Sequence, residues 1–377
     1  MKNIIMLDPR GILFNSDLAT IQRHKNYIDL LNKESNIKEV YRLTILSLSK
    51  NSKIEMIVDG NLIIKSLGTP TINFIKYSYF CAQEIKQNLN KTAFIVCGDP
   101  WISFLSAYFL RIFVQNKLKI QIQIHADISS PEWTNISLKN YLKKFIHKFA
   151  VNNSDQIRVV SSHLKDWLIH EYKIESKKVI VSPVPLNLIK IKKSKSRASY
   201  VAFFGRIEAD RGVFDFVKMI QIIANQEKNL KVMVIGEGEL KNYLNRELKK
   251  LVPARNLIFT GHLNGTDLVT QLQKVKMLLS TAPSESYGMA VRECLVNGIP
   301  VLAITSPALM RLRDKFDGVG FELIQRNQVQ NGEFMKFFLA LQKCRVAPEI
   351  KKQILIENWQ GARQLVLSWK NLDQLKR

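Results

Sequence analysis

The chain contains few cysteines, no long hydrophobic run and far fewer acidic than basic residues. Its four cysteines lie far apart in 377 residues, without a CxxC pair or a Cys/His cluster of zinc spacing. We therefore expect free thiols in a reducing compartment rather than a disulfide framework or a structural zinc site. The longest apolar run, Trp101–Val114, is too short to cross a bilayer and contains Arg111, which favours a buried helix.

Further classes of protein are excluded by the start of the chain and by its composition. The first residues, MKNIIMLD, have no long apolar stretch before a cleavage site, so no secretory signal is expected. With 46% hydrophobic and 23% charged residues, the chain is not a disordered, collagen-like or low-complexity protein. A length of 377 residues exceeds one ordinary domain and predicts two.

The charge of the chain is strongly positive, with 56 Lys and Arg against 32 Asp and Glu and a net charge of +24. The excess is spread over the whole sequence rather than concentrated in one tail. Such a field favours anionic partners, namely nucleic acid, anionic lipid or phosphorylated small molecules. A lysine-rich composition without functional meaning explains the same numbers, so both interpretations stay open.

Apolar runs of strand length alternate with longer amphipathic stretches along most of the chain. Asn3–Leu7 and Thr92–Cys97 are typical of buried strands, and 17–31 and 101–115 are typical of the helices between them. This alternation predicts an α/β fold with parallel sheets and right-handed crossovers.

The alternation stops at the polar, basic stretch 189–198 and restarts with a strand at 200–204. We expect two Rossmann-like, doubly wound domains, 1–188 and 199–377, joined by this stretch as a linker. The last helix is a candidate to pack back on the first domain. Two such domains leave a central cleft, and ligands are expected there at the carboxyl ends of the strands.

Two arginines follow the strand 200–204. Gly205 and Arg206 come directly after it, and Arg211 and Gly212 follow five residues later. A glycine allows a sharp turn, and the N-terminus of the next helix favours an anion. Two guanidinium groups beside such a terminus would clamp a diphosphate, since each binds bidentately. The alternative is a pair of exposed surface arginines after an ordinary turn.

Two glutamates lie in the stretch PSESYGMAVRE, which covers 283–293. Glu285 falls in the loop after the strand 277–280, and Glu293 falls in the helix that starts near Gly288. The loop amides of 286–288 lie at that helix start and can donate to hydroxyl or phosphate groups. A carboxylate accepts from sugar hydroxyls, although paired carboxylates also occur in hydrolases at a defined separation. Solvated glutamates without a role are the plain alternative.

In this order, GRIEADRG and PSESYGMAVRECLVNGIPV resemble the family 4 glycosyltransferases, which have the GT-B fold. The family pattern is G-R-x4-K-G followed by E-x7-E and G-x-P-V, and here Arg211 replaces the usual Lys. The stretch VIGEGELKNYL at 234–244 also resembles the family's G-x-G segment. The resemblance is strong over 199–310 and weak over the first half.

The resemblance implies a retaining, metal-independent hexosyltransferase that needs no cofactor besides its nucleotide-sugar donor. The acceptor would be a glycan or a lipid-linked or phosphorylated compound, in cell-surface polysaccharide or lipopolysaccharide synthesis in the cytoplasm of a bacterium. Arg206 and Arg211 would hold the donor diphosphate beside Gly205. Glu285 would accept from the sugar hydroxyls, and Glu293 would bind the nucleotide ribose.

It also implies roles for further residues at the donor and acceptor sides. The backbone of Ser286, Tyr287 and Gly288 would help to seat the sugar, and the loop at Leu263 would flank the base. In the first domain, His125 of the stretch IHAD would lie near the sugar on the acceptor side. The family's Gly-Gly loop after the first strand is reduced to Gly11, and its Asn-Gly segment is replaced by SPVPL at 182–186.

Three other functions remain as alternatives. The net charge suits a nucleic-acid-binding protein, but the basic residues are not interleaved with aromatic residues in one stretch, and no nucleic-acid motif is present. A sugar-nucleotide epimerase or a phosphorylase could use the same two-domain fold, because a fold does not fix a function.

The helix expected at 136–150 bears on the acceptor. Its apolar residues Leu138, Leu142, Phe145 and Phe149 share one side, and its lysines Lys139, Lys143, Lys144 and Lys148 lie elsewhere around it. One interpretation is a helix that packs its apolar side on the core and exposes the lysines to water. The other is a basic surface that attaches the protein peripherally to the anionic inner face of the plasma membrane.

Overall fold

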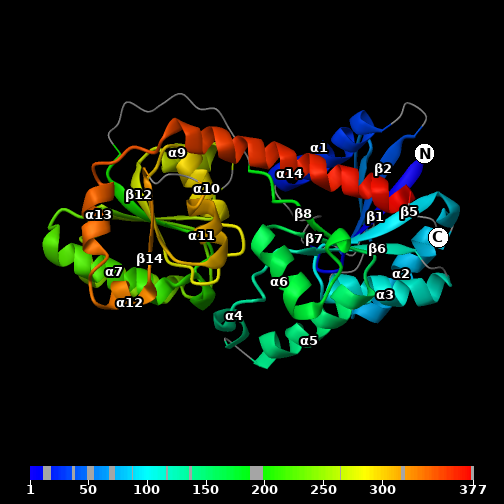
Figure 1. Ribbon diagram of the computed structural model, residues 1–377, viewed down its shortest axis with the longest axis horizontal. Coiled ribbons are helices and arrows are strands. Elements are labelled where there is room, and N and C mark those ends of the chain that lie inside the picture. Colours follow the sequence, from blue (N-terminus) through cyan, green and yellow to red (C-terminus); the bar gives the residue numbers. More distant parts are fainter. Residues whose placement is uncertain are drawn as a thin grey trace. The chain divides into compact units, whose positions relative to one another are not determined.

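The computed structural model describes residues 1–11, 18–35, 39–48, 55–67, 73–86, 88–115, 118–135, 138–186, 198–263, 265–315 and 319–374. The chain divides into two compact units, shown in Figure 1. Unit 1 contains Met1–Ala126, Ser137–Pro185 and Trp359–Arg377, and unit 2 contains Asp127–Ile136 and Leu186–Asn358. The predicted linker 189–198 lies outside the described residues except for its last position.

The sheet of unit 1 has eight strands in the described part of the chain, in the order β3-β4-β2-β1-β5-β6-β7-β8. All neighbours are parallel except β3 and β4, which form a short antiparallel hairpin across Asp59 and Gly60. The strands are β1 (Lys2–Asp8), β2 (Tyr41–Ser47), β3 (Met56–Asp59), β4 (Leu62–Ser66), β5 (Thr92–Cys97), β6 (Lys119–Ile124), β7 (Gln156–Val159) and β8 (Val179–Val181).

Helices cover both faces of this sheet. The chain leaves β1 toward β2 on one side and later returns to β5 on the other, so right-handed crossovers place helices on opposite faces. In Figure 1, α1 and α14 lie on one face, and α2, α3 and α5 lie on the other. The helices are α1 (Leu18–Glu34), α2 (Phe74–Lys86), α3 (Ile102–Val114), α5 (Leu138–Asn153), α6 (Ser162–Tyr172) and α14 (Pro348–Gln374).

The long helix α14 begins in unit 2 and ends in unit 1. Its second half packs on the sheet of unit 1, where Leu365, Val366 and Leu372 join a core cluster that includes β1 and β2. Trp369 is buried in this cluster, and its indole nitrogen donates a hydrogen bond of 2.8 Å to the Gln121 side chain. The residues 359–377 therefore belong to unit 1 rather than to the domain 199–377 in which the sequence pattern places them.

The sheet of unit 2 has six described strands, all parallel, in the order β11-β10-β9-β12-β13-β14. The strands are β9 (Tyr200–Phe204), β10 (Val232–Ile235), β11 (Leu257–Gly261), β12 (Val275–Ser280), β13 (Val301–Ile304) and β14 (Phe321–Ile324). The helical segments are α4 (Pro131–Asn135), η3 (Ala209–Arg211), α7 (Val213–Gln226), α8 (Lys241–Leu251), α9 (Gly265–Leu272), α10 (Met289–Val296), α11 (Pro307–Arg313), α12 (Arg326–Gln330) and α13 (Met335–Leu341).

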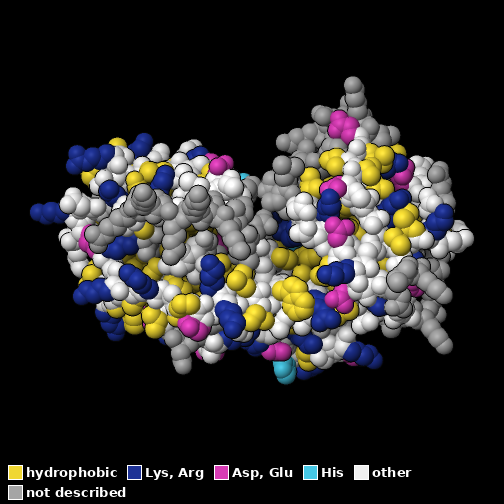
Figure 2. Space-filling model, turned by 90° about the horizontal axis from the view of Figure 1, so that it is seen from above, with side chains coloured by type: hydrophobic (Ala, Val, Ile, Leu, Met, Phe, Trp, Pro, Cys, Tyr) yellow, Lys and Arg dark blue, Asp and Glu magenta, His cyan; other side chains and the backbone are white. Residues whose placement is uncertain are grey.

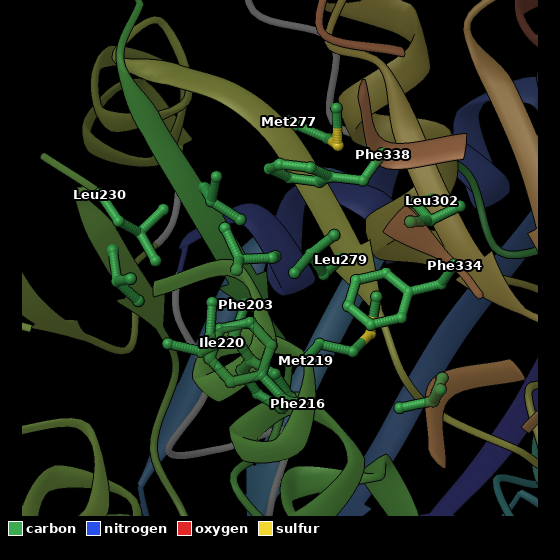
Figure 3. Close-up of a cluster of buried hydrophobic side chains, with 14 of the residues drawn as sticks. Phe203, Phe216, Met219, Ile220, Leu230, Met277, Leu279, Leu302, Phe334 and Phe338 are labelled. Carbon is green, nitrogen blue, oxygen red and sulfur yellow. The ribbon is translucent and has the colours of Figure 1, made fainter. Parts of the chain in front are cut away.

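The two faces of this sheet are made by alternate residues of each strand. Phe203 and Leu279 point to a cluster with Phe216 of α7 and Phe338 of α13, which Figure 3 shows in close-up. Ala202, which precedes Phe203 in β9, joins a second cluster with residues of α9, α10 and α11. Both sheet faces are therefore buried, as the nearly continuous apolar strands of a parallel sheet require. The fold predicted from the sequence, α/β with parallel sheets, is confirmed.

The exposed side of α5 corrects one expectation. Leu138, Leu142 and Phe145 face solvent, and Phe149 is 41% exposed with one edge against α3, whereas His147 and Ala150 on the opposite side are buried. The first interpretation of this helix, an apolar side against the core, is therefore wrong. The sequence shows amphipathicity but does not show which side of a helix meets the protein.

Surface charge does not form one basic patch on the face that Figure 2 shows. Lys and Arg side chains lie on both units, separated by hydrophobic and acidic side chains. None of the helices in the described part of the chain combines the length and the apolar character that are needed to cross a membrane.

Two tryptophans of α14 test how this helix is held. We expect Trp369→Ala to lower the free energy of unfolding of unit 1 by about 3–5 kcal/mol, because it removes a buried ring from the core. Trp359→Ala is the matched control, since the Trp359 ring is 57% exposed on the same helix and should cost within about 0.5 kcal/mol. Denaturant unfolding measures both variants, and equal losses would contradict this account of α14.

Candidate functional site

The strand order of unit 2 places several loops at one edge of the sheet. The chain reverses its direction of winding between β9 and β12, and ligands of such sheets bind beyond the carboxyl ends of the strands at this point. Gly205 and Arg206 follow β9, Gly236 follows β10, and Glu285 lies in the loop after β12. All of these residues therefore share the edge at which a ligand is expected.

Close backbone contacts hold these loops together. Gly212 has a φ angle of +69°, and a Cβ atom there would lie 1.9 Å from the carbonyl oxygen of Thr281. A Cβ atom on Gly236, whose φ is +140°, would lie 1.9 Å from the carbonyl oxygen of Gly205. No other residue fits at either position without displacing backbone, so the loops after β9, β10 and β12 approach one another through glycine.

Arg211 and Glu285 come together across the loops after β9 and β12. The Nη1 atom of Arg211 donates a 3.0 Å hydrogen bond to Oε2 of Glu285, and both side chains are largely buried. The Thr281 hydroxyl donates to the carbonyl oxygen of Arg211 and fixes the backbone between them. Seventy-four residues apart in sequence, a predicted phosphate-binding residue and a predicted sugar-binding residue form one ion pair.

Arg206 is more exposed than Arg211 and is held by carboxylates of its own loop. Its guanidinium donates to Glu208 and, at 3.0 Å, to Asp210. Asp210 also lies 4.0 Å from Nε of Arg211, so one carboxylate stands between the two predicted diphosphate ligands. Both guanidinium groups therefore lie beside the same carboxylate of this loop.

Glu293 lies in the first turns of α10, with a carboxyl group that is mostly shielded from water. Burial raises its pKa from the ordinary value of 4.5 to about 7. Among the described residues, no side chain donates a hydrogen bond or contributes an ion pair to this carboxyl group. A shielded carboxyl group without a donor is costly to keep charged, and a bound hydroxyl group would reduce that cost.

The loop at 286–288 is shaped by a stacked pair of side chains beneath it. The Arg292 guanidinium lies 3.7 Å from the centre of the buried Tyr287 ring and donates to the Tyr287 carbonyl oxygen. Gly288, with φ of +79°, caps α10, and a Cβ there would meet Leu309 at 2.7 Å. The amides of Tyr287 and Gly288 donate to no acceptor in the described part of the chain, so they can receive one.

Leu263, predicted to flank a base, lies after β11 at the same edge, half-buried against the core. The structure thus gathers Gly205, Arg206, Arg211, Leu263, Glu285, Ser286, Tyr287, Gly288 and Glu293 in unit 2. The two other predicted residues, Gly11 and His125, belong to unit 1.

Unit 1 has a cavity of about 250 Å³ at the carboxyl ends of its own central strands. It lies where β1 and β5 wind in opposite directions, and its lining includes Asp8, Asp99 and His125. His125 accepts or donates a 3.3 Å hydrogen bond with Gln123, according to its tautomer. Although its surface is open to the cavity, surrounding protein atoms and the nearby Arg158 and Arg23 lower the pKa of His125, which favours the neutral imidazole.

A buried arginine contributes positive charge to this cavity. Arg158 is 3% exposed and donates to Gln123, to the Tyr27 hydroxyl and to the carbonyl oxygens of Ser182 and Pro183. None of these partners is charged, and no described carboxylate pairs with it. A buried cation without a counter-ion is unusual and raises the potential of the cavity for anions.

Gly11 does not line this cavity. Its φ angle is +67°, and a Cβ there would lie 2.5 Å from the carbonyl oxygen of Leu48, so the glycine serves the contact between two loops. The neighbouring Arg10 does reach the cavity and forms a 2.8 Å ion pair with Asp99, which also accepts from the start of α3. Among the described residues, no three His, Cys, Asp or Glu side chains are placed to hold a metal ion.

The part of the chain that forms this edge of the unit 2 sheet is similar to known proteins. Residues 187–327 match the family model described as glycosyl transferases group 1. Unit 2 contains a glycosyltransferase group 1 domain. The match covers the arginine pair, both glutamates and the loops after β9, β10, β11 and β12.

Relatives and solved structures agree with this assignment. The chain is 22% identical over 264 residues to an uncharacterized glycosyltransferase of Methanocaldococcus jannaschii, covering 64% of this chain and 66% of that protein. It is 22% identical over 192 residues to the alpha-monoglucosyldiacylglycerol synthase of Streptococcus pneumoniae, covering 46% and 43%. The match therefore spans about two thirds of the first relative and less than half of the second.

The fold is shared over the whole chain. Sucrose-phosphate synthase from Thermosynechococcus elongatus has a TM-score of 0.70 at 13% identity, covering 99% of this chain and 96% of that one. Anabaena HepE in complex with UDP-glucose has a TM-score of 0.68 at 14% identity, covering 97% and 99%. Both units thus take the fold of GT-B glycosyltransferases.

Sequence reasoning missed several residues around the glycosyltransferase group 1 domain and the cavity of unit 1. Asp210 lies inside the motif GRIEADRG, and its spacing of four from Arg206 was a usable signal for an ion pair. Arg158, a charged residue between the apolar Ile157 and Val159 of β7, was a second signal. Arg292 and its partner Glu357, 3.8 Å apart, gave none, because 64 residues separate them and only the fold brings them together.

Glu293 makes the stability of the domain depend on pH. Its folded-state pKa of about 7 exceeds the unfolded value of 4.5, so the charged carboxylate opposes folding above pH 7 and this penalty disappears as the pH falls toward 4.5. We expect Glu293→Gln to raise the free energy of unfolding by about 1–3 kcal/mol at pH 8 and to change it little at pH 5. Denaturant unfolding at both pH values is the measurement.

The control for this test is Glu239→Gln, which changes an exposed carboxylate of the same unit. It should leave the stability unchanged at both pH values. The same increase in the free energy of unfolding at pH 5 and pH 8 for Glu293→Gln, or no increase at either, would contradict the claim that burial raises the pKa of this carboxyl group.

Proposed function

We propose that this protein is a retaining family 4 glycosyltransferase that moves a sugar from a nucleotide-sugar donor to a glycan, lipid-linked or phosphorylated acceptor. One observation carries this proposal, namely the Arg211–Glu285 ion pair at the carboxyl edge of the unit 2 sheet, inside the matched domain. A guanidinium group binds a diphosphate through charge-assisted hydrogen bonds, and a carboxylate accepts hydrogen bonds from sugar hydroxyl groups.

Donor binding would replace this ion pair by contacts to the ligand. The diphosphate takes the Arg211 guanidinium, and the Glu285 carboxylate then accepts hydrogen bonds from hydroxyl groups of the adjacent sugar. Arg206, held by Glu208 and Asp210 in the free protein, supplies the second guanidinium. Because each group already has a charged partner, both are oriented before the donor arrives.

Glu293 is suited to the ribose of the donor. Its carboxyl group is shielded and lacks a hydrogen-bond donor among the described residues, and a ribose offers two neighbouring hydroxyl groups. Hydrogen bonds from these hydroxyls would stabilise the charged form and lower the pKa of Glu293 from about 7. The free amides of Tyr287 and Gly288 are available to oxygen atoms of the sugar or phosphate.

The reaction requires stabilisation of the leaving group more than a strong base. The bond between the anomeric carbon and the diphosphate oxygen breaks, and negative charge develops on the departing phosphate beside Arg206 and Arg211. The acceptor hydroxyl attacks on the same face of the sugar, and its proton passes to the departing phosphate oxygen. The nucleoside diphosphate leaves, and the anomeric configuration is retained.

The acceptor is assigned to the cavity of unit 1, which lies at the carboxyl ends of its strands and contains His125. Arg158 and Arg23 add positive charge to this cavity, in which Asp99 neutralises Arg10, and this charge suits a phosphorylated or carboxylated acceptor. Two comparisons support these assignments: HepE was solved with UDP-glucose, and the pneumococcal relative is a glucosyldiacylglycerol synthase. Cell-surface polysaccharide or lipopolysaccharide synthesis in the cytoplasm is the setting that fits such an acceptor.

The two arginines test the proposal. We expect Arg206→Ala and Arg211→Ala each to slow release of nucleotide from a nucleotide sugar by roughly 30- to 1,000-fold, since each loses a contact that strengthens in the transition state. Wild type is first screened against several nucleotide sugars to find the donor. Arg246→Ala, an exposed arginine paired with Glu247 on α8, is the matched control. Wild-type rates in a folded Arg206→Ala, Arg211→Ala double variant would refute the proposed site.

Metal dependence is a separate test of the same chemistry. If guanidinium groups neutralise the leaving diphosphate, activity in EDTA should stay within about twofold of the untreated enzyme. Loss of activity in EDTA that manganese or magnesium restores would mean that a cation, rather than the arginine pair alone, carries this charge.

A further inference from the structure

Helix α5 presents an apolar stripe to solvent. Leu138, Leu142 and Phe145 are 91%, 61% and 60% exposed, and Tyr141 and Phe149 are exposed beside them. The spacing of three and four places all five on one side of the helix, opposite the buried His147, Ala150 and Val151. A soluble surface helix normally turns its apolar stripe inward, so this orientation points to a partner outside unit 1.

Aromatic contacts extend this stripe across two more helices. Phe149 of α5 lies 5.3 Å from Tyr108 of α3, centre to centre, and 5.8 Å from Phe104. On the other side of α3, Phe109 contacts Phe74 and Phe113 contacts Tyr79, both of α2. The three helices cover one face of the unit 1 sheet in Figure 1. We call this surface, with the exposed residues Ile75, Tyr79, Phe80, Ile112, Leu138, Tyr141, Leu142, Phe145 and Phe149, the aromatic face.

Lysines flank the aromatic face on both sides of α5. Helical spacing puts Lys144 and Lys148 on one flank and Lys139 and Lys143 on the other. None of the four forms an ion pair with a carboxylate in the described part of the chain. Two of them are held over aromatic rings, Lys143 over Trp101 at 5.0 Å and Lys148 over Tyr172 at 5.8 Å. Their charge is therefore available to an external anion.

We propose that the aromatic face of α2, α3 and α5 docks unit 1 on an anionic lipid bilayer. Leucine and aromatic side chains would enter the boundary between headgroups and acyl chains, and the flanking lysines would contact the anionic headgroups. This arrangement of an apolar stripe between lysines is the pattern of a helix that lies in the membrane interface. It needs no helix that spans the membrane.

Charge complementarity favours a bilayer over a second copy of this chain. A self-complementary contact through α5 would bring the lysines of two copies close together without any carboxylate between them, and such like charges repel. An anionic bilayer meets the same lysines with opposite charge, worth about 1 kcal/mol each near the surface.

Docking would also bring the cavity of unit 1 close to the bilayer. The Trp101 indole nitrogen donates to the Lys143 carbonyl oxygen at 3.1 Å, so the start of α3 is fixed to α5. That same start is capped by Asp99, which lines the cavity. Such proximity would make a lipid-linked compound the natural acceptor, and this consequence rests on the proposed function. The docking proposal itself does not rest on it.

Co-sedimentation of the full chain with lipid vesicles tests the proposal. Wild type should bind vesicles of equal parts phosphatidylglycerol and phosphatidylcholine at low salt. Binding should weaken at high salt and on vesicles of phosphatidylcholine alone. Two double variants, Leu142→Ser with Phe145→Ser and Lys139→Gln with Lys144→Gln, should each reduce the partition coefficient by about 10- to 30-fold.

Matched controls use exposed residues of unit 2. Leu339→Ser, and Lys228→Gln with Lys249→Gln, change the same residue types and should stay within about twofold of wild type. Thermal unfolding verifies that every variant is folded. The rate of nucleotide release from a soluble donor should be equal in all of them, because the donor site lies in unit 2. Failure of nucleotide release in wild type would therefore refute the proposed function without touching the docking proposal.

Three results would overturn the docking proposal. One is no binding to anionic vesicles at low salt. The second is binding that both α5 double variants leave unchanged. The third is a concentration-dependent dimer in gel filtration that the Leu142→Ser, Phe145→Ser variant abolishes, without vesicle binding, which would make the aromatic face a contact between two copies.

Discussion

The backbone contact between Gly212 and Thr281 is the constraint on which the candidate site depends. A Cβ atom at Gly212 would lie 1.9 Å from the Thr281 carbonyl oxygen, so only glycine lets the loop after β9 touch the loop after β12. That contact sets Arg211, one residue before Gly212, against Glu285, four residues after Thr281. Gly236 repeats the arrangement against Gly205 on the other side of β9. The close approach of the two backbones thus brings the two side chains within reach of an ion pair.

Charged groups without compensation mark both candidate binding regions. Glu293 is shielded, with a pKa raised to about 7 by burial, and Arg158 is buried among neutral acceptors. Each costs stability in the free protein, and under the proposed function a ligand would complement each of them, hydroxyl groups the first and an anion the second. The apolar stripe of α5 is a third unfavourable feature of the free protein, because its hydrophobic side chains are exposed to water. In all three places the protein alone is incomplete, which is why these places are informative about function.

Much of the fold and several residues of the candidate site could be predicted from the sequence. Apolar runs of strand length and the glycine-containing motifs predict the two doubly wound sheets and the residues at the carboxyl edge of the second. Helices α6 and α11 were missed, because their short amphipathic patterns are weak beside the buried strands. Helix α5 was found, but its orientation was not, because periodicity reports that a helix has two sides and leaves open which side meets the core.

Contacts between residues far apart in the chain were the part that the sequence could not supply. The roles of Arg211 and Glu285 were predicted separately, and nothing in their motifs indicates that the two side chains bond to each other. The same holds for Arg158, whose uncharged partners come from β6, α1 and the chain after β8. Local pattern predicts which residues matter, whereas the fold decides which of them neutralise one another.

The central claim is that a diphosphate replaces Glu285 as the partner of the Arg211 guanidinium. Calorimetric titration with a nucleoside diphosphate tests this claim most directly. If the claim is right, Arg211→Ala binds the nucleotide at least about tenfold more weakly than wild type. Glu285→Gln binds it as tightly as wild type or more tightly, because the guanidinium no longer has to leave an ion pair. Equal loss of nucleotide binding in both variants, or no loss in Arg211→Ala, would contradict the account.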